Sequence, residues 1–259
     1  GLWSWWYENG QKSREENYEN GNENGLHPRW YENGQMRGEV RWKNGKHDGL
    51  WTWWYESGQK EREQNYKDNK MMSVEAWKPN GEKCPVTNVK DGNGVIVNYY
   101  EDGQKAEETN YKDGKRDGLS TEWYPNGQKK WETNYKDGKR DGLWSWWYEN
   151  GQKSKEENYK DGKRDGLYTE LYENGQKKDE RNYKYNKLDG LAIEWYENGQ
   201  KKAEENWKDH KLMSAEVWKP DGEKCLETNI KDGNGVSVSY KEDGTERGRY
   251  TYKDGVQAY

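Results

Sequence analysis

The residues of this chain that could do chemistry are spread along it and not gathered in one place. The three histidines, His27, His47 and His210, have no spacing typical of metal ligands, and we expect them at surface positions. The two cysteines, Cys84 and Cys225, are far apart in the sequence. These residues therefore predict no metal site, no cofactor site and no catalytic nucleophile.

Two acidic patterns look like functional motifs, but turns and strands explain them better. Residues 113–118 have the order Asp-Gly-x-x-Asp-Gly, yet Lys115 and Arg116 lie inside this segment, and a calcium loop needs about six converging oxygens. Carboxylate pairs such as Glu156 and Glu157 recur along the chain, so none marks a single glycosidase-like site. We interpret the first pattern as turn chemistry and the second as solvated strand surface. We expect no enzyme activity.

Aromatic residues at alternate positions are the pattern most typical of a binding surface. Three segments have the order Trp-x-Trp-x-Tyr, and alternate residues of a strand point to the same side. Such a row suits sugar stacking or a protein partner, although cross-strand packing within a sheet uses the same rings. The predicted partner-binding residues are Trp3, Trp5, Tyr7, Trp51, Trp53, Tyr55, Trp144, Trp146 and Tyr148.

A repeat of 24 residues positions these rows. Glycine starts successive repeats at Gly1, Gly25, Gly49, Gly94, Gly118, Gly142, Gly166 and Gly190, in steps of 24 except for the one that ends at Gly94. The clearest repeat is GLWSWWYENGQKSKEENYKDGKRD at residues 142–165. A period of this size is typical of arrays in which each repeat contacts only its neighbours.

Each repeat predicts a β-hairpin. The run WSWWY favours a strand, and Asn150-Gly151 favours a two-residue type I′ turn that pairs Glu149 with Gln152. The linker that follows Tyr159 predicts a second polar turn. No segment has a helical period. We therefore predict an all-β fold, an elongated single-layer antiparallel β-meander built from tandem hairpins of about 24 residues.

The expected register sorts the side chains by face. Leu143, Ser145 and Trp147 share one face with Ser154, Glu156 and Asn158, and Trp144, Trp146 and Tyr148 share the other with Lys153, Lys155 and Glu157. The first face recurs with little change between repeats, whereas the second varies. We expect packing on the first face and partner contact on the second.

Two shortened repeats, at residues 73–93 and 214–234, interrupt the array. They divide the chain into a block of four repeats at 1–93, a block of six at 94–234 and a terminal repeat at 235–259. Cys84 and Cys225 occupy matching places in the shortened repeats, six repeats apart. In a linear ribbon that separation excludes a disulfide between them. We expect each to be a half-buried residue beneath a neighbouring Trp.

The repeat resembles the bacterial variant of the MORN repeat, both in the turn YENGQ at 148–152 and in the linker YKDGKRDG at 159–166. Proteins of this kind are often described as similar to YwqK-type antitoxins. The resemblance implies a single-layer sheet of stacked hairpins, roles in protein binding, scaffolding and lipid contact, and no shared catalytic residues. The shortened repeats and the absence of Phe depart from the family pattern.

Composition narrows the remaining function classes. Charged residues make up 36% of the chain and hydrophobic ones 29%, with 17 Trp and 21 Tyr, a balance too polar for an ordinary core and too aromatic for disorder. A net charge of −5 with mixed signs gives no basic stripe for nucleic acid, and no apolar run is long enough for a membrane span. We expect a non-catalytic scaffold that binds a protein partner or copies of itself. The alternatives are a carbohydrate- or cell-wall-binding module that takes a glycan, and an antitoxin or immunity protein.

The two ends of the sequence suggest a further expectation. The chain opens in mid-pattern at Gly1 without a Met, which suggests a processed or excised piece of a bacterial protein, either cytoplasmic or secreted. Gly1 begins a strand and Tyr259 ends a repeat of the same type, so neither end has a polar cap. Uncapped sheet edges favour pairing with other chains.

Overall fold

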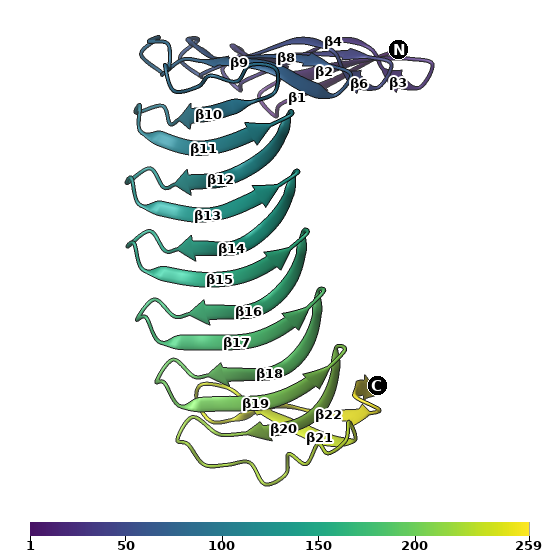
Figure 1. Cartoon of the computed structure of the whole chain (residues 1–259), viewed down its shortest axis with the longest axis vertical. Helices are drawn as coiled ribbons and strands as arrows, with labels where there is room; N and C mark the ends of the chain where they lie inside the picture. The colour runs from purple at the N-terminus through teal and green to yellow at the C-terminus, as the bar shows by residue number, and fades with distance from the viewer. Residues whose placement is uncertain (259) are drawn as a thin grey trace. The chain divides into compact units, whose positions relative to one another are not determined.

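The computed structural model describes residues 1–258, so the end of the last repeat at Tyr259 lies outside the described residues. All regular elements within 1–258 are β-strands, as Figure 1 shows, and every strand pair with a defined register is antiparallel. This range includes no helix that could cross a membrane. The predicted all-β meander of tandem hairpins is confirmed.

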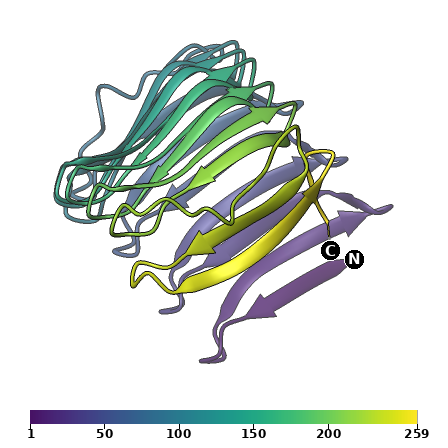
Figure 2. The ribbon, with the colours of Figure 1, turned by 90° about the horizontal axis from the view of Figure 1, so that it is seen from below.

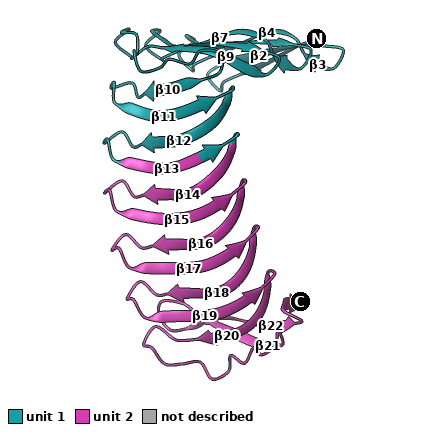
Figure 3. Cartoon of the chain, viewed as in Figure 1, with its two compact units in different colours: residues 1–128, 135–138 teal, residues 129–134, 139–259 magenta. Residues whose placement is uncertain are grey.

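The chain divides into two compact units, coloured separately in Figure 3. Unit 1 comprises residues 1–128 and 135–138, and unit 2 comprises 129–134 and the described residues from 139 onward. Strand β13 (Lys129–Lys136) contributes residues to both units.

Unit 1 contains two runs of consecutively paired strands. The first run has the order β1-β2-β4-β5-β7-β8-β9, with the short strands β3 and β6 beside β2 and β5, and the second run is β10-β11-β12. Their bounds are β1 (Leu2–Trp6), β2 (Lys12–Glu19), β3 (Asn22–Glu23), β4 (Gly25–Trp30), β5 (Met36–Lys43), β6 (Lys46–His47), β7 (Gly49–Trp54), β8 (Lys60–Lys67), β9 (Lys70–Ala76), β10 (Gly94–Tyr99), β11 (Lys105–Lys112) and β12 (Lys115–Trp123).

Unit 2 repeats this plan. Strands β14 to β20 pair in sequence order, and β21-β22-β23 form a separate small sheet. Their bounds are β14 (Lys139–Trp147), β15 (Lys153–Lys160), β16 (Lys163–Leu171), β17 (Lys177–Lys184), β18 (Lys187–Trp195), β19 (Lys201–Lys208), β20 (Lys211–Val217), β21 (Gly235–Tyr240), β22 (Glu246–Lys253) and β23 (Val256–Ala258).

The Asn-Gly turn differs from the expected one. The Gly151 N–H donates to the Tyr148 carbonyl at 2.9 Å, and the Tyr148 N–H donates to the Gln152 carbonyl at 2.8 Å. Gly151, at φ 84°, has a positive φ, whereas Asn150 does not. This is a type I turn followed by a glycine bulge, so the predicted type I′ turn and the Glu149–Gln152 pair are wrong. The Asn150 side-chain oxygen accepts the Gln152 N–H at 2.9 Å, which satisfies a donor that the longer loop leaves free of the strand ladder.

The type I′ turn occurs at the other end of the hairpin. Lys160 pairs with Lys163 across two residues, Asp161 and Gly162, whose φ angles are 51° and 81°. Positive φ at both central residues defines this turn, and it matches the twist of the flanking strands. The Asp-Gly linker therefore provides the tight connection between successive repeats.

The predicted register is right along most of the hairpin. Leu143 lies opposite Asn158, and Trp146 lies opposite Lys155. The bulge then shifts the ladder by one residue, so that Trp147 faces Lys153 and not Ser154. The face assignment therefore holds from the linker end of the hairpin up to the bulge.

A tyrosine at the start of each Asn-Gly turn fastens one repeat to the next. The hydroxyl of Tyr148 donates to the Leu171 carbonyl at 2.7 Å, 23 residues ahead. Tyr172 does the same to Trp195 at 2.9 Å, and in unit 1 Tyr7 bonds the Trp30 carbonyl at 2.8 Å. We call these bonds the tyrosine seams. They join neighbouring hairpins in a sheet that has little apolar material to pack.

The hydrophobic core is concentrated at the two shortened repeats. There the chain leaves one sheet and begins the next, so we call residues 62–107 corner 1 and residues 203–248 corner 2. Figure 2 shows β21 and β22, in yellow, lying apart from the ladder that ends at β20. The buried clusters of corner 1 are Met71, Val74, Val89 and Ile96, and Ala76, Cys84 and Val97. Those of corner 2 are Ala203, Val217, Cys225, Val238 and Tyr240, and Leu212, Ala215 and Ile230.

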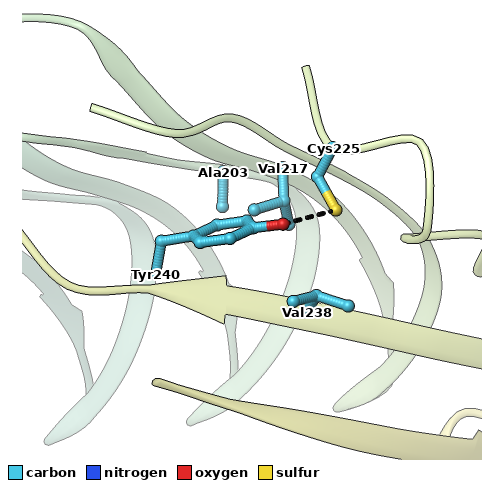
Figure 4. Close-up of a cluster of buried hydrophobic side chains, with 5 residues drawn as sticks. All are labelled: Ala203, Val217, Cys225, Val238 and Tyr240. Atoms are coloured by element: carbon cyan, nitrogen blue, oxygen red, sulfur yellow. Dashed lines mark hydrogen bonds between the residues drawn. The ribbon is translucent and has the colours of Figure 1, made fainter. Parts of the chain in front are cut away.

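Both cysteines lie inside these clusters as free thiols. Cys84 is 1% exposed and Cys225 is 5% exposed, so the expectation of half-buried residues beneath a Trp is wrong. Their neighbours are small aliphatic side chains and a tyrosine, because the corner places each thiol between two sheets. The sulfur lies 3.2 Å from the Tyr99 hydroxyl in corner 1 and 3.2 Å from the Tyr240 hydroxyl in corner 2, as Figure 4 shows for corner 2.

Candidate binding face

The aromatic row of β14 forms a stack, as its alternation suggests. The rings of Trp144 and Trp146 lie 4.1 Å apart at 25°. The Arg140 guanidinium lies 3.4 Å from the Trp144 ring, and the Lys155 ammonium lies 3.8 Å from the Trp146 ring. Each indole is stacked on the other through one face, and a cation covers its opposite face. The result is a four-layer sandwich of cation, indole, indole and cation.

The tryptophans of β7 serve as packing within unit 1. Trp51 lies among Trp42, His47 and Tyr66, with ring centroids 6.1, 4.3 and 4.7 Å away. Trp53 covers Gly38 so closely that a Cβ at that glycine would lie 2.5 Å from the Trp53 ring. Trp51 and Trp53 do not form one flat platform, because each ring is packed against a strand of the preceding repeat.

The tryptophans of β1 are the more open pair. Trp3 and Trp5 stack with their centroids 6.3 Å apart, and the Arg14 guanidinium lies 4.0 Å from the Trp5 ring. Trp3 is 63% exposed. Together with Glu16 and Tyr18 the two rings line a shallow hollow.

The three tyrosines of the predicted site lie in the tyrosine seams. Tyr7, Tyr55 and Tyr148 donate to the carbonyls of the next repeat, and Tyr55 is buried, with its hydroxyl 2.9 Å from the Trp77 carbonyl. Burial raises the pKa of both Tyr55 and Tyr148. The structure therefore leaves the tryptophans of β1 and β14 at a surface, packs those of β7 against the preceding repeat, and places the tyrosines between hairpins.

Sequence reasoning missed a buried ionic cluster beside the β14 stack. Glu157 is 2% exposed, and it accepts hydrogen bonds from Arg164 Nη2 at 2.9 Å and from the Tyr159 hydroxyl at 2.6 Å. The interpretation of Glu157 as solvated surface is therefore wrong. The sequence shows the same alternating charges around an exposed carboxylate as around Glu157. Glu157 differs because Arg164 of the neighbouring strand covers it.

The next strand continues the cluster. Arg181 on β17 binds Asp179 at 2.7 Å and Glu194 of β18 at 2.8 Å. Burial raises the pKa of Asp179 even though Arg181 opposes that change, and burial would lower the pKa of Arg181, but its bond to Asp179 raises it. The polar hollow along this cluster is lined by Lys155, Glu157, Arg164, Tyr168, Glu170, Asp179, Arg181 and Tyr183. We call this surface, with the β14 stack, the charged aromatic face.

The face that varies little between repeats does not form a core. Leu143, Leu167 and Leu191 are 42%, 41% and 40% exposed, so the expectation that this face packs is wrong for its leucines. These strands form a single layer, and a single-layer sheet has no second layer to cover them.

The expectation of surface positions is right for His210, which is exposed, but wrong for His27. His27 is 3% exposed, and its Nε2 lies 3.0 Å from the Asn17 carbonyl. Its ring lies between the rings of Tyr18 and Trp42, because the alternation of side chains along β4 points it to the face on which these two rings lie. Among residues 1–258 no three His, Cys, Asp or Glu side chains are grouped as a metal ion would require.

Comparison with known proteins finds one family whose model matches most of the chain. The model of the family described as "MORN repeat variant" matches residues 1–20, 23–44, 48–68, 93–113, 116–137, 140–161, 164–185 and 188–209. These matches leave out residues 69–92 and everything after 209, and so exclude the second shortened repeat and residues 73–92 of the first. No curated protein matches the chain.

Solved structures give only distant similarity. The structure described as "Crystal Structure of TcdB2-TccC3-Cdc42" is 12% identical over 92% of this chain, with a TM-score of 0.18. The one described as "Crystal Structure of TcdB2-TccC3" is 10% identical over 87% of it, with a TM-score of 0.15. The chain spans 16% and 17% of the length of these two chains.

Proposed function

Because the chain belongs to the MORN repeat variant family, we propose that it is a non-catalytic repeat scaffold whose charged aromatic face in unit 2 binds a protein partner. Repeats that contact only their neighbours make an extended sheet, and such a sheet presents side chains in fixed rows. Rows of this kind can bind a partner through several side chains at once.

The observation that carries the proposal is the composition and order of the charged aromatic face. Trp, Tyr and Arg are the residue types that contribute most to the energy of protein interfaces. Here Arg140, Trp144, Trp146 and Lys155 are held in a fixed stack. Arg164 and Arg181 are fixed by buried carboxylates beside it. Side chains that are already ordered lose little conformational entropy when a partner binds.

The same geometry disfavours a glycan as the occupant. A sugar ring binds by lying on an uncovered aromatic face. The outer faces of Trp144 and Trp146 are covered by Arg140 and Lys155 at 3.4 and 3.8 Å. A sugar would have to displace a cation from each ring, whereas a protein carboxylate can bind these same cations in place.

Affinity capture with the full chain tests the proposal. The variant Trp144→Ser with Trp146→Glu uses residues that the preceding repeat already has at Ser120 and Glu122, so the strand should form as before. We expect the protein captured from a lysate of the source organism by the unaltered chain to be lost with this variant. Leu143→Ser, on the opposite face, is the matched control and should capture the same protein.

Two outcomes contradict the proposal. If the double variant keeps its strand spectrum in circular dichroism and captures the same protein as the unaltered chain, the face is not the binding surface. If the unaltered chain is instead retained by insoluble cell-wall polysaccharide and the double variant is not, the occupant is a glycan. Light scattering that gives a multiple of the chain mass would identify the partner as a second copy.

A further inference from the structure

The inner lining of corner 1 is closed by a side-chain bridge. Arg62 on β8 donates from Nη1 to the side-chain oxygen of Asn98 on β10 at 3.1 Å. The Asn98 amide donates to Glu107 on β11 at 3.1 Å. This chain of bonds joins the two sheets of unit 1 across the inside of the corner.

Corner 2 lacks that bridge. Its residues at the matching positions, 141 further along the sequence, are Ala203, Ser239 and Gly248. In place of the bridge unit 2 has a hollow of about 330 Å³ between β18 to β20 on one side and β21 and β22 on the other. The inner lining of the corner is thus bridged in one unit and open in the other.

Within residues 1–258, one carboxylate of this hollow lacks a counter-ion and one hydroxyl lacks a hydrogen-bond partner. Glu205 accepts a hydrogen bond from Trp207 Nε1 at 2.9 Å, but no Lys, Arg or His of residues 1–258 forms an ion pair with it. The hydroxyl of Ser239 is buried without any hydrogen-bond partner within the same range. Glu205 is half-buried. A carboxylate withdrawn from solvent without a counter-ion and a buried hydroxyl without a partner both cost folding free energy.

The charges around Glu205 are mostly negative. Burial raises the pKa of its carboxyl, the charges of Glu194 and Asp179 add to this effect, and Trp207 and Arg181 oppose it. Arg181 is shared between Asp179 and Glu194, at 2.7 and 2.8 Å. Positive charge inside the hollow would therefore be stabilised by its surroundings.

The cations at the edge of the hollow do not supply that charge. Lys202 lies 3.5 Å from Glu194 and is engaged there. Arg247 also lines the hollow, but its side chain is exposed to solvent. Tyr250 and Tyr252 complete the wall, and aromatic rings are favourable neighbours for a cation.

We propose that the hollow of corner 2 binds a primary ammonium or guanidinium group, with Glu205 as its counter-ion and the Ser239 hydroxyl as a hydrogen-bond acceptor. Such a group can be the side chain of a lysine or arginine in a partner protein, or a small free amine. Both share the chemistry that the hollow lacks. The proposal does not depend on a partner at the charged aromatic face, because none of the residues that line the hollow lies on the β14 stack. Asp179 and Arg181 of that face contribute only to the charge around Glu205.

A titration of the full chain followed by nuclear magnetic resonance tests the site. The probes are Nα-acetyl-lysine methylamide, Nα-acetyl-arginine methylamide and the free diamine cadaverine, with uncharged Nα-acetyl-norleucine methylamide as the control. Binding of the two blocked amino acids indicates a protein side chain as the occupant, and binding of cadaverine alone indicates a small amine. If no cation binds, or if the norleucine probe binds as well as the lysine probe, the proposal is wrong.

Corner 1 provides the variants. Glu205→Gln introduces the residue found at Gln64, the matching position in unit 1, and should weaken cation binding roughly tenfold or more. The double variant Ala203→Arg with Ser239→Asn introduces the pair found at Arg62 and Asn98 and should abolish binding by filling the hollow.

The matched control is Glu204→Gln. Glu204 bonds Lys201 at 2.6 Å and does not line the hollow, so binding should be unchanged. Thermal unfolding of each variant verifies that it is folded. Unchanged affinity in a folded Glu205→Gln variant would contradict the assignment of the counter-ion.

Discussion

The two corners make the same change of sheet with different inner linings. In both, a fully buried valine, Val97 or Val238, has 0% exposure. The hydroxyl of a threonine accepts the N–H of that valine, from Thr87 at 2.9 Å in corner 1 and from Thr228 at 3.0 Å in corner 2. The residues that the corners share thus bury apolar surface or satisfy the backbone.

The residues in which the corners differ face the space between the sheets. Arg62 and Asn98 bridge that space in corner 1, and Ala203 and Ser239 leave it open in corner 2. The comparison teaches that the change of sheet does not depend on the bridge. The shared buried set determines the corner, and its inner lining is free to carry a binding site.

The largest expected effect concerns the glycines that start β10 and β21. Gly94 and Gly235 have φ angles of 138° and 134°, and a Cβ would lie 2.7 Å from the Asn88 carbonyl oxygen and 2.6 Å from that of Asn229. Because both the conformation and the contact are unfavourable, Gly94→Ala and Gly235→Ala should each cost about 3 kcal/mol or more in urea unfolding. Gly103→Ala is the control, since Gly103 has a φ of 85° in open space, and should cost about 1 kcal/mol. Equal losses at Gly94 and Gly103 would show that the close approach does not shape the corner.

The buried valines should have the next largest effect. Val97→Ala and Val238→Ala each remove two methyl groups from a fully buried site and should cost about 2 kcal/mol in urea unfolding. Val256→Ala, at a position 58% exposed, should change stability by less than about 0.5 kcal/mol. A much smaller loss at Val238 than at Val97 would mean that the open corner relaxes around the cavity, and the two corners would then not be energetically equivalent.

The thiol and phenol pairs should have a smaller effect, again the same in both corners. Burial would raise the pKa of Cys225, but its bonds from Tyr240 and Thr228 lower it, and the bond to Cys225 raises the pKa of Tyr240 to about 12. Tyr240→Phe and Tyr99→Phe should therefore each raise the thiol pKa and cost about 0.5–1 kcal/mol. Ultraviolet titration of the thiolate measures the first effect. A thiol pKa that does not move in either variant would show that the contact is not a hydrogen bond.

The smallest expected effect is a pH dependence of stability that arises in corner 2 alone, because Glu205 there corresponds to Gln64 in corner 1. The pKa of Glu205 is raised in the folded protein, mainly by burial, so its ionised form is less favourable there than in the unfolded chain, and stability falls as pH rises through the folded pKa. Glu205→Gln removes this penalty and should stabilise the protein at neutral pH. The gain should disappear below the ordinary Glu pKa of about 4.3, where both states are protonated. Thermal unfolding at several pH values measures it, and destabilisation at neutral pH would contradict the claim that the carboxylate lacks a counter-ion.

The repeated elements could be predicted from the sequence because their signals are local. The 24-residue period and the dipeptides Asn150-Gly151 and Asp161-Gly162 placed the hairpins, and the register was right from Leu143 to Trp146. The type I′ turn was assigned to Asn150-Gly151, whereas it occurs at Asp161-Gly162, because both dipeptides contain a glycine. What distinguishes them is how many residues separate the paired strands, and that depends on where the ladder ends.

The features that could not be predicted depend on neighbours from other strands. Glu157 is buried because Arg164 and Tyr159 surround it, and its own sequence context matches that of exposed carboxylates. The hollow of corner 2 exists because Ala203 and Ser239 are small. Small residues in a strand carry no such signal until the opposing sheet is known.

The tyrosine seams also set a rule for how the length of this chain can change by mutation. Each seam reaches 23 residues ahead within the regular array, as from Tyr148 to Leu171. It reaches 22 residues where a shortened repeat follows, as from Tyr196 to Trp218. Duplication or deletion of one whole 24-residue repeat by recombination between these near-identical segments would leave every seam with a partner. An insertion of any other length would leave a tyrosine hydroxyl facing the wrong carbonyl. The genes of such proteins should therefore gain and lose length in whole repeats, and the two corners should keep their sequences while the number of hairpins between them changes.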